Sequence, residues 1–392
     1  MANTFTTTST QGCASRLMNS VIGILLGPVL VIGAIVLLSW NEGRAVQAIR
    51  GLAEASNAVV ESSPDAVAPG NEGRLVHVTG KATASAAIQD ADLNLTFADA
   101  VAVNRTVEMF QWKEKKEEKT QDNTGGSQTT TTTYTYSKAW SEDAVDSSSF
   151  AHPDGHENPP MPFASHRFAA SDARLGGFTL DETTLGMIDT ANPLKPDAPE
   201  GWTQSGGGLY KGADPATPAV GDIRVHYASL PSGAVISILA RQSAGGFAPY
   251  TTSNGYQIHL ARAGNAPALL MIADQRKAES MLTWILRGVG TLLMFIGFTM
   301  FFGPIAVLAS VIPFLGSLVR GATAAFALVL TIPVALVTIA VSWLVFRPLI
   351  GGGMLVLAAG LGYLLWRWHH SRTAPHVAAQ QAAAAAGATP QH

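Results

Sequence analysis

The chain has 392 residues, of which 47% are hydrophobic and only 14% are charged, a balance typical of a membrane protein that also carries one folded domain. Its formal net charge of −3 leaves no basic surplus to neutralise phosphates, which excludes a general nucleic-acid binder. The single cysteine, Cys13, excludes an intrachain disulfide, so packing must hold the fold together.

The N-terminal region joins a polar tail to the first apolar run. Residues 1–17 are rich in Thr and Ser and predict a disordered tail. Residues 18–40 predict a transmembrane helix instead of a cleaved signal peptide, because the run is long, no small-x-small cleavage site follows it, and Trp40 suits a water boundary. After Arg44, apolar residues at three- and four-residue spacing predict a separate amphipathic helix that leaves the bilayer.

Residues 41–287 predict one mainly β domain of the α+β class, inserted between the first and second of four transmembrane helices. Period-two alternation with many aromatics at 105–113 and 134–140 predicts the two arms of a hairpin. Between these arms, residues 114–133 are charged and then Gly- and Thr-rich, which predicts a mobile loop.

The last hundred residues are three long apolar runs, separated by Arg320 and Arg347. Runs of this length without an ionisable group predict transmembrane helices at 288–312, 321–346 and 348–366. Because the connection at Phe346-Arg347-Pro348 is so short, the last two helices must form a tight antiparallel pair. Residues 367–392 are rich in Ala and Gln and predict a disordered cytosolic tail.

Charges at the ends of the spans predict the topology. Four spans place both termini on one side and the domain on the other, and Arg16, Arg320 and Arg367 lie on the side of the termini. The excess of positive charge predicts cytosolic termini and an extracytoplasmic domain. Three cations near the second span lie on the domain side and weaken this bias: Arg276, Lys277 and Arg287.

The sequence carries no clear catalytic or metal-binding pattern. His152, His156 and Glu157 are weak metal candidates, because the Pro and Gly between them predict a loop without established ligand geometry. No nucleophile motif is present, so we expect no catalytic residue, no cofactor and, on balance, no enzyme. Gly23 and Gly27 form a GxxxG pair that is either a helix contact face or simply the glycine common in membrane helices.

Three segments together resemble one known family. They are Ser-Trp-Asn-Glu-Gly-Arg-Ala at 39–45, Asn-Glu-Gly-Arg-Leu-Val-His-Val at 71–78 and Trp-Ile-Leu-Arg-Gly-Val-Gly at 284–290. With one span before the domain and three after it, the chain resembles the LUMA family (transmembrane protein 43), and its composition suits a bacterial homologue. The resemblance implies a self-associating membrane protein that organises other membrane proteins, in the endoplasmic reticulum and inner nuclear membrane of animals or the bacterial inner membrane with a periplasmic domain. It carries over no catalytic residue.

The two roots of the domain supply the candidate structural residues. If the first two spans pack side by side, Glu42 can pair with Arg287 and fix the angle between domain and membrane, although ordinary snorkelling of interface charges is an equal alternative. The remaining members of this predicted interface set are Asn41, Gly43, Arg44, Trp284, Gly288, Arg347 and Pro348.

Two functions follow from this reading. The first is a multispan membrane scaffold whose partners are the lipid bilayer, further copies of the chain and other membrane proteins, with no nucleic acid. The alternative is a lipid-handling enzyme or transporter that uses the domain as a lid over the bilayer. A pocket at the domain–membrane junction lined by polar groups with displaced pKa values would favour the alternative, and its absence would favour the scaffold.

Overall fold

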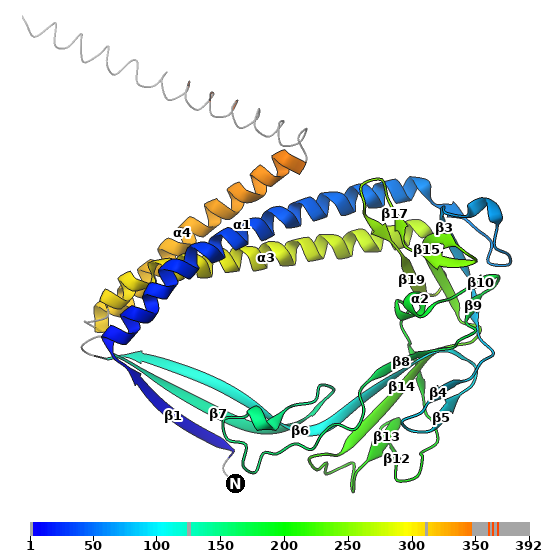
Figure 1. Ribbon diagram of the computed structural model, residues 1–392, viewed down its shortest axis with the longest axis horizontal. Helices are drawn as coiled ribbons and strands as arrows, with labels where there is room; N and C mark the ends of the chain where they lie inside the picture. The colour runs from blue at the N-terminus through cyan, green and yellow to red at the C-terminus, as the bar shows by residue number, and fades with distance from the viewer. Residues whose placement is uncertain are drawn as a thin grey trace, which may run out of the picture.

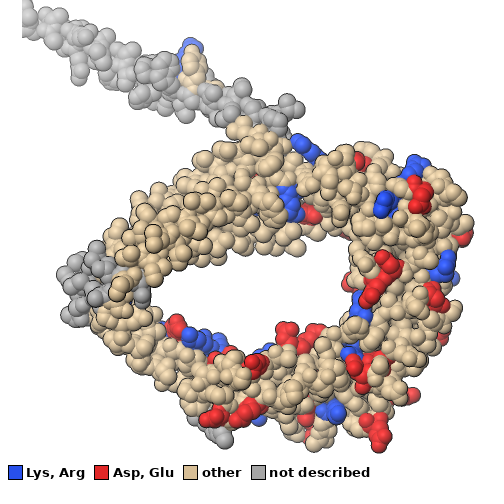
Figure 2. Space-filling view, in the orientation of Figure 1, with Lys and Arg blue, Asp and Glu red and all other residues tan. Residues whose placement is uncertain are grey.

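The computed structural model describes residues 3–123, 127–309 and 313–346, together with the isolated positions 360, 363 and 367. These residues form a ring (Figure 1), with long helices along one side, a β-rich domain at one end and a long hairpin along the opposite side. The space-filling view shows that side chains leave the middle of the ring open (Figure 2). The fold combines helices with a large β-rich domain, as the sequence predicted.

Three described helices are long and apolar enough to cross a membrane: α1 (Cys13–Ala58), α3 (Ala268–Ala309) and α4 (Pro313–Phe346). Each leaves large apolar side chains exposed, for example Leu25, Leu292 and Val337. Figure 2 shows that the helical side of the ring is nearly free of charge, whereas charges gather on the domain and hairpin. Such a surface is unfavourable in water and is covered by lipid tails in a bilayer. Of the predicted fourth span, 348–366, the structure describes only residues 360 and 363, which are both helical.

The helices do not stop where the predicted spans stop. α1 continues without a break from Trp40 to Ala58, and α3 begins at Ala268, twenty residues before the predicted span at 288. The sequence prediction of a separate amphipathic helix after Arg44 is therefore wrong. We call residues 41–58 of α1 and 268–287 of α3 the stalk, because this helix pair extends about 30 Å beyond the predicted spans at 1.5 Å per residue.

The domain contains two larger sheets. One has the strand order β1-β7-β6-β14-β13-β12, with β8 beside β6 and β11 beside β14. The other has the order β10-β9-β3-β15-β16, with β19 beside β15 and β2 parallel to β3. The domain also contains two short strand pairs, β4–β5 and β17–β18, and the short helix α2. The bounds are β1 (Thr4–Gln11), β2 (Val60–Glu61), β3 (Leu75–Thr83), β4 (Ile88–Asp90), β5 (Leu95–Phe97), β6 (Ala100–Asp122), β7 (Gln128–Ser141), β8 (His166–Ala169), β9 (Arg174–Leu175), β10 (Phe178–Thr179), α2 (Glu182–Gly186), β11 (Asn192–Leu194), β12 (Thr203–Ser205), β13 (Gly208–Lys211), β14 (Ile223–Pro231), β15 (Val235–Ser243), β16 (Gly246–Ala248), β17 (Tyr250–Thr251), β18 (Gln257–Ile258) and β19 (Leu260–Ala263).

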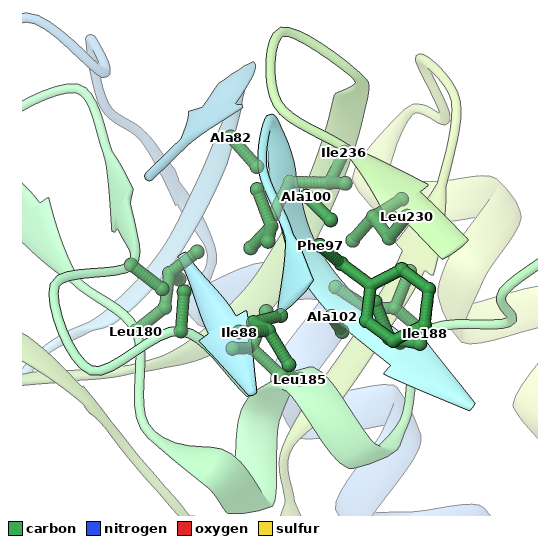
Figure 3. Close-up of a cluster of buried hydrophobic side chains, with 14 of the residues drawn as sticks. Ala82, Ile88, Phe97, Ala100, Ala102, Leu180, Leu185, Ile188, Leu230 and Ile236 are labelled. Carbon is green, nitrogen blue, oxygen red and sulfur yellow. The ribbon is translucent and has the colours of Figure 1, made fainter. Parts of the chain in front are cut away.

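Alternating side chains from both sheets fill the main core. Val225 and Tyr227 on β14 point inward with Val76 and Val78 on β3, because successive residues of a strand face opposite sides. Figure 3 shows part of this core, including Phe97, Leu185 and Ile236. The predicted hairpin arms at 105–113 and 134–140 lie within β6 and β7, which pair antiparallel.

A second core fixes the stalk to the domain. Leu52 and Ala55 of α1 pack with Met271 and Ile272 of α3, and the cluster continues into the sheet through Leu239 of β15. All five side chains are at most 4% exposed. Burial of several apolar side chains at this joint resists movement of the domain relative to the stalk.

Two segments predicted to be disordered form strands. Thr4–Gln11 is β1, which pairs antiparallel with β7 so that Thr7 lies opposite Thr132. The predicted mobile loop at 114–133 is instead the extension of β6 and β7, with only 124–126 outside the described residues. Thr is β-branched and favours extended backbone, and along β6 the ion pairs Lys115–Glu117 and Lys116–Glu118 join side chains two residues apart on one face.

Candidate functional site

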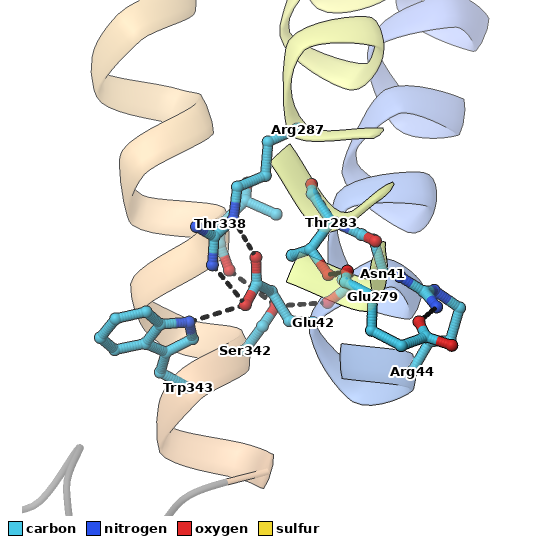
Figure 4. A network of polar contacts seen from close by, with 10 residues as sticks. Asn41, Glu42, Arg44, Glu279, Thr283, Arg287, Thr338, Ser342 and Trp343 are labelled. Atoms are coloured by element: carbon cyan, nitrogen blue, oxygen red, sulfur yellow. Dashed lines mark hydrogen bonds and ion pairs between the residues drawn. The ribbon is translucent and has the colours of Figure 1, made fainter. Parts of the chain in front are cut away.

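The candidate site is a polar cluster where the three described membrane helices meet at the base of the stalk (Figure 4). We call it the polar junction. Its members come from α1, from α3 and from the end of α4: Asn41, Glu42, Arg44, Glu279, Thr283, Arg287, Ser342 and Trp343.

Glu42 is the most completely bonded member of the polar junction. Its side chain is 2% exposed. Arg287 donates from Nε to Oε1 at 2.6 Å and from Nη2 to Oε2 at 2.9 Å, and Trp343 Nε1 donates to Oε2 at 2.7 Å. A buried carboxylate is costly unless donors compensate its charge, and here three N–H groups do so. The structure thus brings Glu42 and Arg287 into the contact that the sequence hypothesis required.

Two tryptophans flank the Arg287 guanidinium. The guanidinium carbon lies 4.7 Å from the ring centre of Trp284 and 6.0 Å from that of Trp343, within the range of cation–π attraction. Trp284 nevertheless stays 66% exposed, as expected for a side chain at a membrane boundary. Sequence reasoning missed Trp343, although a Trp near the end of a charge-free run is a usable signal for such a boundary.

A second ion pair extends the polar junction toward the domain. Arg44 contacts the Glu279 carboxylate and also donates from Nη2 to Thr283 Oγ1 at 3.2 Å. Asn41 donates to the Thr283 carbonyl at 3.1 Å. The Tyr256 hydroxyl donates to Glu279 at 2.9 Å, and burial raises the pKa of Tyr256 to about 12. The network therefore joins both stalk helices to the β17–β18 hairpin.

A pocket of about 500 Å³ lies beside the polar junction, in the groove between the stalk helices. Its wall on α1 is small and apolar, with Ala45, Ile49 and Ala53. Its wall on α3 includes Arg276 and Ser280, and further lining comes from Glu42, Glu279, Thr283, Trp284, Arg287 and Trp343. The pocket and its polar groups lie at the junction of domain and membrane, where the lipid-handling alternative places its site.

The other predicted interface residues behave differently from one another. A Cβ on Gly43 would lie 2.8 Å from the tip of the Phe346 ring of α4, so a larger residue there requires that ring to shift. Gly288 has nothing within 4 Å of a Cβ position, so no contact demands a glycine. Arg347 and Pro348 lie outside the described residues.

The GxxxG pair is a contact face within the chain. A Cβ on Gly23 would lie 2.7 Å from the Met300 carbonyl oxygen, and one on Gly27 would lie 2.6 Å from that of Gly297. Small residues let two helix backbones approach closely, so α1 and α3 use these glycines to pack against each other.

The weak metal candidates lie in an aromatic cluster. His152 stacks on Phe5 of β1 at 4.3 Å, and the fully buried His156 stacks on Tyr136 at 4.0 Å. Glu157 accepts a hydrogen bond from the Gly155 backbone at 2.8 Å. Within the described part of the chain, no group of three or more His, Cys, Asp or Glu side chains is placed to hold a metal. Of the two histidines, His152 stacks on β1 and His156 meets Phe5 edge-on at 6.1 Å.

A buried ionic network inside the domain was not predicted. Arg105 is 2% exposed and donates to Asp90 at 2.5 Å and Asp92 at 2.7 Å, while Tyr227 donates to Asp90 at 2.5 Å. The guanidinium also lies 4.8 Å from the ring centre of Phe163. These contacts satisfy a buried charge inside the core and point to a structural role.

The chain is similar to known proteins over most of its length. The family model described as transmembrane protein 43 matches residues 109–348. The chain is 33% identical over 357 residues to transmembrane protein 43 of Rattus norvegicus, covering 86% of this chain and 88% of the relative. It is 31% identical over 362 residues to the Homo sapiens protein, covering 88% and 89% of the two chains. The Drosophila melanogaster homologue is also 31% identical over 362 residues, covering 87% and 93%. No solved structure matches the chain significantly.

Proposed function

Because this chain belongs to the transmembrane protein 43 family and is an integral membrane protein, we propose that it is a multispan membrane scaffold. In this function it associates with further copies of itself and holds a folded domain at a fixed distance and angle from the bilayer. Other membrane proteins then assemble against this domain. The proposal agrees with the organising role that the family resemblance implied.

The stalk is the observation that carries the proposal. Both stalk helices run from the membrane region into the domain without a break, and two ion pairs cross-link them at the polar junction. A lid that opens and closes needs a hinge. The glycines of the described stalk on α1 do not supply one, since a Cβ on Gly51 would lie 2.6 Å from Tyr256 and Gly43 is packed on Phe346.

The proposed topology keeps the termini in the cytosol and the domain on the opposite side, periplasmic in a bacterium or lumenal in an animal cell. This topology is incompatible with the pairing of β1 and β7 in a membrane. A bilayer crossed at Val21–Trp40 would put about 30 Å of hydrocarbon between β1 and the domain. The β6–β7 hairpin contacts Arg16 through Asp122. The hairpin also carries the charged residues 115–119, so it cannot lie in hydrocarbon. We therefore propose that β1 and the hairpin tip lie on opposite sides of the bilayer in a membrane and do not pair there.

Separation of β1 supports self-association. Without β1, the edge of β7 that faces away from β6 presents unpaired backbone groups along residues 128–135, the stretch that β1 covers. Such an edge is a template for pairing with a strand of another chain. A second copy carries the same edge, so two hairpins can pair symmetrically.

Lipid handling remains the second candidate function, because the pocket lies where the domain meets the membrane. In that function the domain would move as a lid, and the pocket would open and close. The scaffold and the lid therefore differ in a measurable property, the spread of distances between domain and membrane helices.

Pulsed electron paramagnetic resonance tests this difference. Spin labels are attached at Lys81→Cys on β3 and Val36→Cys on α1, both exposed, in a Cys13→Ser background in lipid nanodiscs. A scaffold gives one narrow distance distribution that does not change with lipid composition. A broad or two-peaked distribution that lipid shifts would instead establish the lid. Single-molecule photobleaching in the same nanodiscs counts copies, and one copy per particle at all protein concentrations would overturn self-association.

A further inference from the structure

We propose that the pocket beside the polar junction binds the phosphate headgroup of an anionic phospholipid, with Arg276 as its principal ligand. This goes beyond the scaffold function and does not depend on it. A lipid held there would be a bound structural partner of the stalk in the leaflet on the domain's side.

The charges around the pocket leave one cation in surplus. Arg287 is paired with Glu42, and Arg44 is paired with Glu279. Arg276 lines the same pocket, is exposed, and makes no ion pair with any residue that the structure describes. An Arg side chain binds phosphate oxygens with two parallel N–H donors, so an anionic phosphate neutralises the surplus in a favourable geometry.

The position of the pocket matches the headgroup layer. Arg50 of α1 donates to the carbonyl of Phe346, the last residue of the described part of α4, at 2.9 Å, and Trp343 of the same helix lines the pocket. Trp284 and Trp343 line it, and Trp side chains gather at the boundary between lipid tails and water. Basic pockets between membrane helices are known binding sites for anionic lipid headgroups.

The surroundings also suit the rest of a phospholipid. Ala45, Ile49 and Ala53 give an apolar wall for the glycerol backbone. On α4, Leu336, Ile332 and Val329 lie at helical spacing on the same face as Trp343 and are between 49% and 64% exposed. Acyl chains can lie along this face, so headgroup and tails find complementary surfaces on neighbouring helices. A free phosphate would contact only the headgroup surface.

The test measures lipid retention by the full chain. Protein in nanodiscs of phosphatidylcholine with a minority of phosphatidylglycerol is transferred to detergent, and bound lipids are counted by native mass spectrometry. We expect selective retention of phosphatidylglycerol by the unmodified protein and a loss of about tenfold in Arg276→Gln, the size expected for a charge-assisted hydrogen bond. Arg276→Lys keeps the positive charge but not the two parallel N–H donors of the guanidinium, and it should reduce phosphatidylglycerol retention less than Arg276→Gln does.

Lys277 supplies the matched control. It is the next residue, its side chain is 81% exposed, it faces Asp274 at 3.7 Å, and it does not line the pocket. Lys277→Gln removes the same charge and should leave retention unchanged. Ser280→Trp fills the pocket without altering charge and should abolish retention, with circular dichroism confirming that each variant is folded.

Several outcomes would overturn the proposal. Equal losses in Arg276→Gln and Lys277→Gln would show attraction by general surface charge. Retention in Ser280→Trp would place the lipid elsewhere, and absence of lipid from the unmodified protein would show that something else, such as chain beyond Phe346, fills the pocket. Displacement of the lipid by millimolar inorganic phosphate would assign the site to a free phosphate.

Discussion

Glu42 and Arg287 are 245 residues apart in the sequence and form two parallel hydrogen bonds between α1 and α3. Because Trp343 donates to the same carboxylate, one side chain ties together the three described membrane helices. The contact lies where the stalk leaves the membrane region, so it fixes the direction in which the stalk projects.

Charge reversal should expose the energetic role of this pair. Glu42→Arg or Arg287→Glu alone leaves like charges in contact at a buried site and should cost about 3–5 kcal/mol. The double reversal should regain only part of this, because Trp343 Nε1 then faces a cation instead of a carboxylate. Thermal unfolding in detergent micelles measures the stability of the two single variants and of the double variant.

Exposed Glu117 on β6 provides the control, since Glu117→Lys makes the same charge change at a side chain that is 55% exposed. That variant should shift stability by less than about 0.5 kcal/mol. If the double reversal is no more stable than the worse single variant, the pairing does not stabilise the fold.

The sequence predicted the apolar helices because their signal is local. A charge-free run of about twenty residues is visible without knowing its neighbours. The stalk was missed for the opposite reason: Asn41 to Arg44 looks like a polar exit from the membrane, and only contacts with Glu279, Thr283 and Arg287 make those residues compatible with a continuous helix.

Long-range pairing also explains the missed strands. Thr-rich segments at 4–11 and 128–133 have low complexity, which favours disorder when each is considered alone. Their β-branched side chains favour extended backbone once a partner strand is present, and the partners are more than a hundred residues apart. The pocket was likewise beyond reach, because Ile49, Arg276 and Trp343 meet only after the helices pack.

The close contact of α1 with α3 predicts a difference between two glycines of the same helix. Gly27→Ala places a methyl group 2.6 Å from the Gly297 carbonyl oxygen and should destabilise by about 1–3 kcal/mol through overpacking. Gly33→Ala meets nothing within 4 Å and should be neutral or slightly stabilising, since Ala favours helix over Gly. Thermal unfolding of the two variants side by side checks this, and equal effects would contradict the contact.

The competition between topology and strand pairing predicts a disulfide that depends on the membrane. Thr7 lies opposite Thr132 in the β1–β7 register, so the double variant Thr7→Cys with Thr132→Cys, in a Cys13→Ser background, can form a bond when the strands pair. We expect no intrachain cross-link in native membranes, because the bilayer separates the two positions, and a cross-link after extraction into mild detergent. The paired positions Lys113 and Ser137 within the hairpin serve as control and, as cysteines, should cross-link in both conditions. Efficient cross-linking between positions 7 and 132 in membranes would overturn the four-span topology.

Acid should destabilise the domain through His259. Burial lowers the pKa of this imidazole, although nearby Asp181 opposes the shift, and its Nε2 lies 3.0 Å from Thr184 Oγ1 on α2. A pKa below the ordinary value of 6.5 means that folding favours the neutral ring. The stabilisation is therefore fully present above pH 6.5 and is lost as the pH falls through the lowered pKa. His259→Phe removes the titrating group and should flatten the fall in unfolding temperature between about pH 7.5 and pH 5. An identical slope in the parent protein and His259→Phe would show that other groups control the acid response.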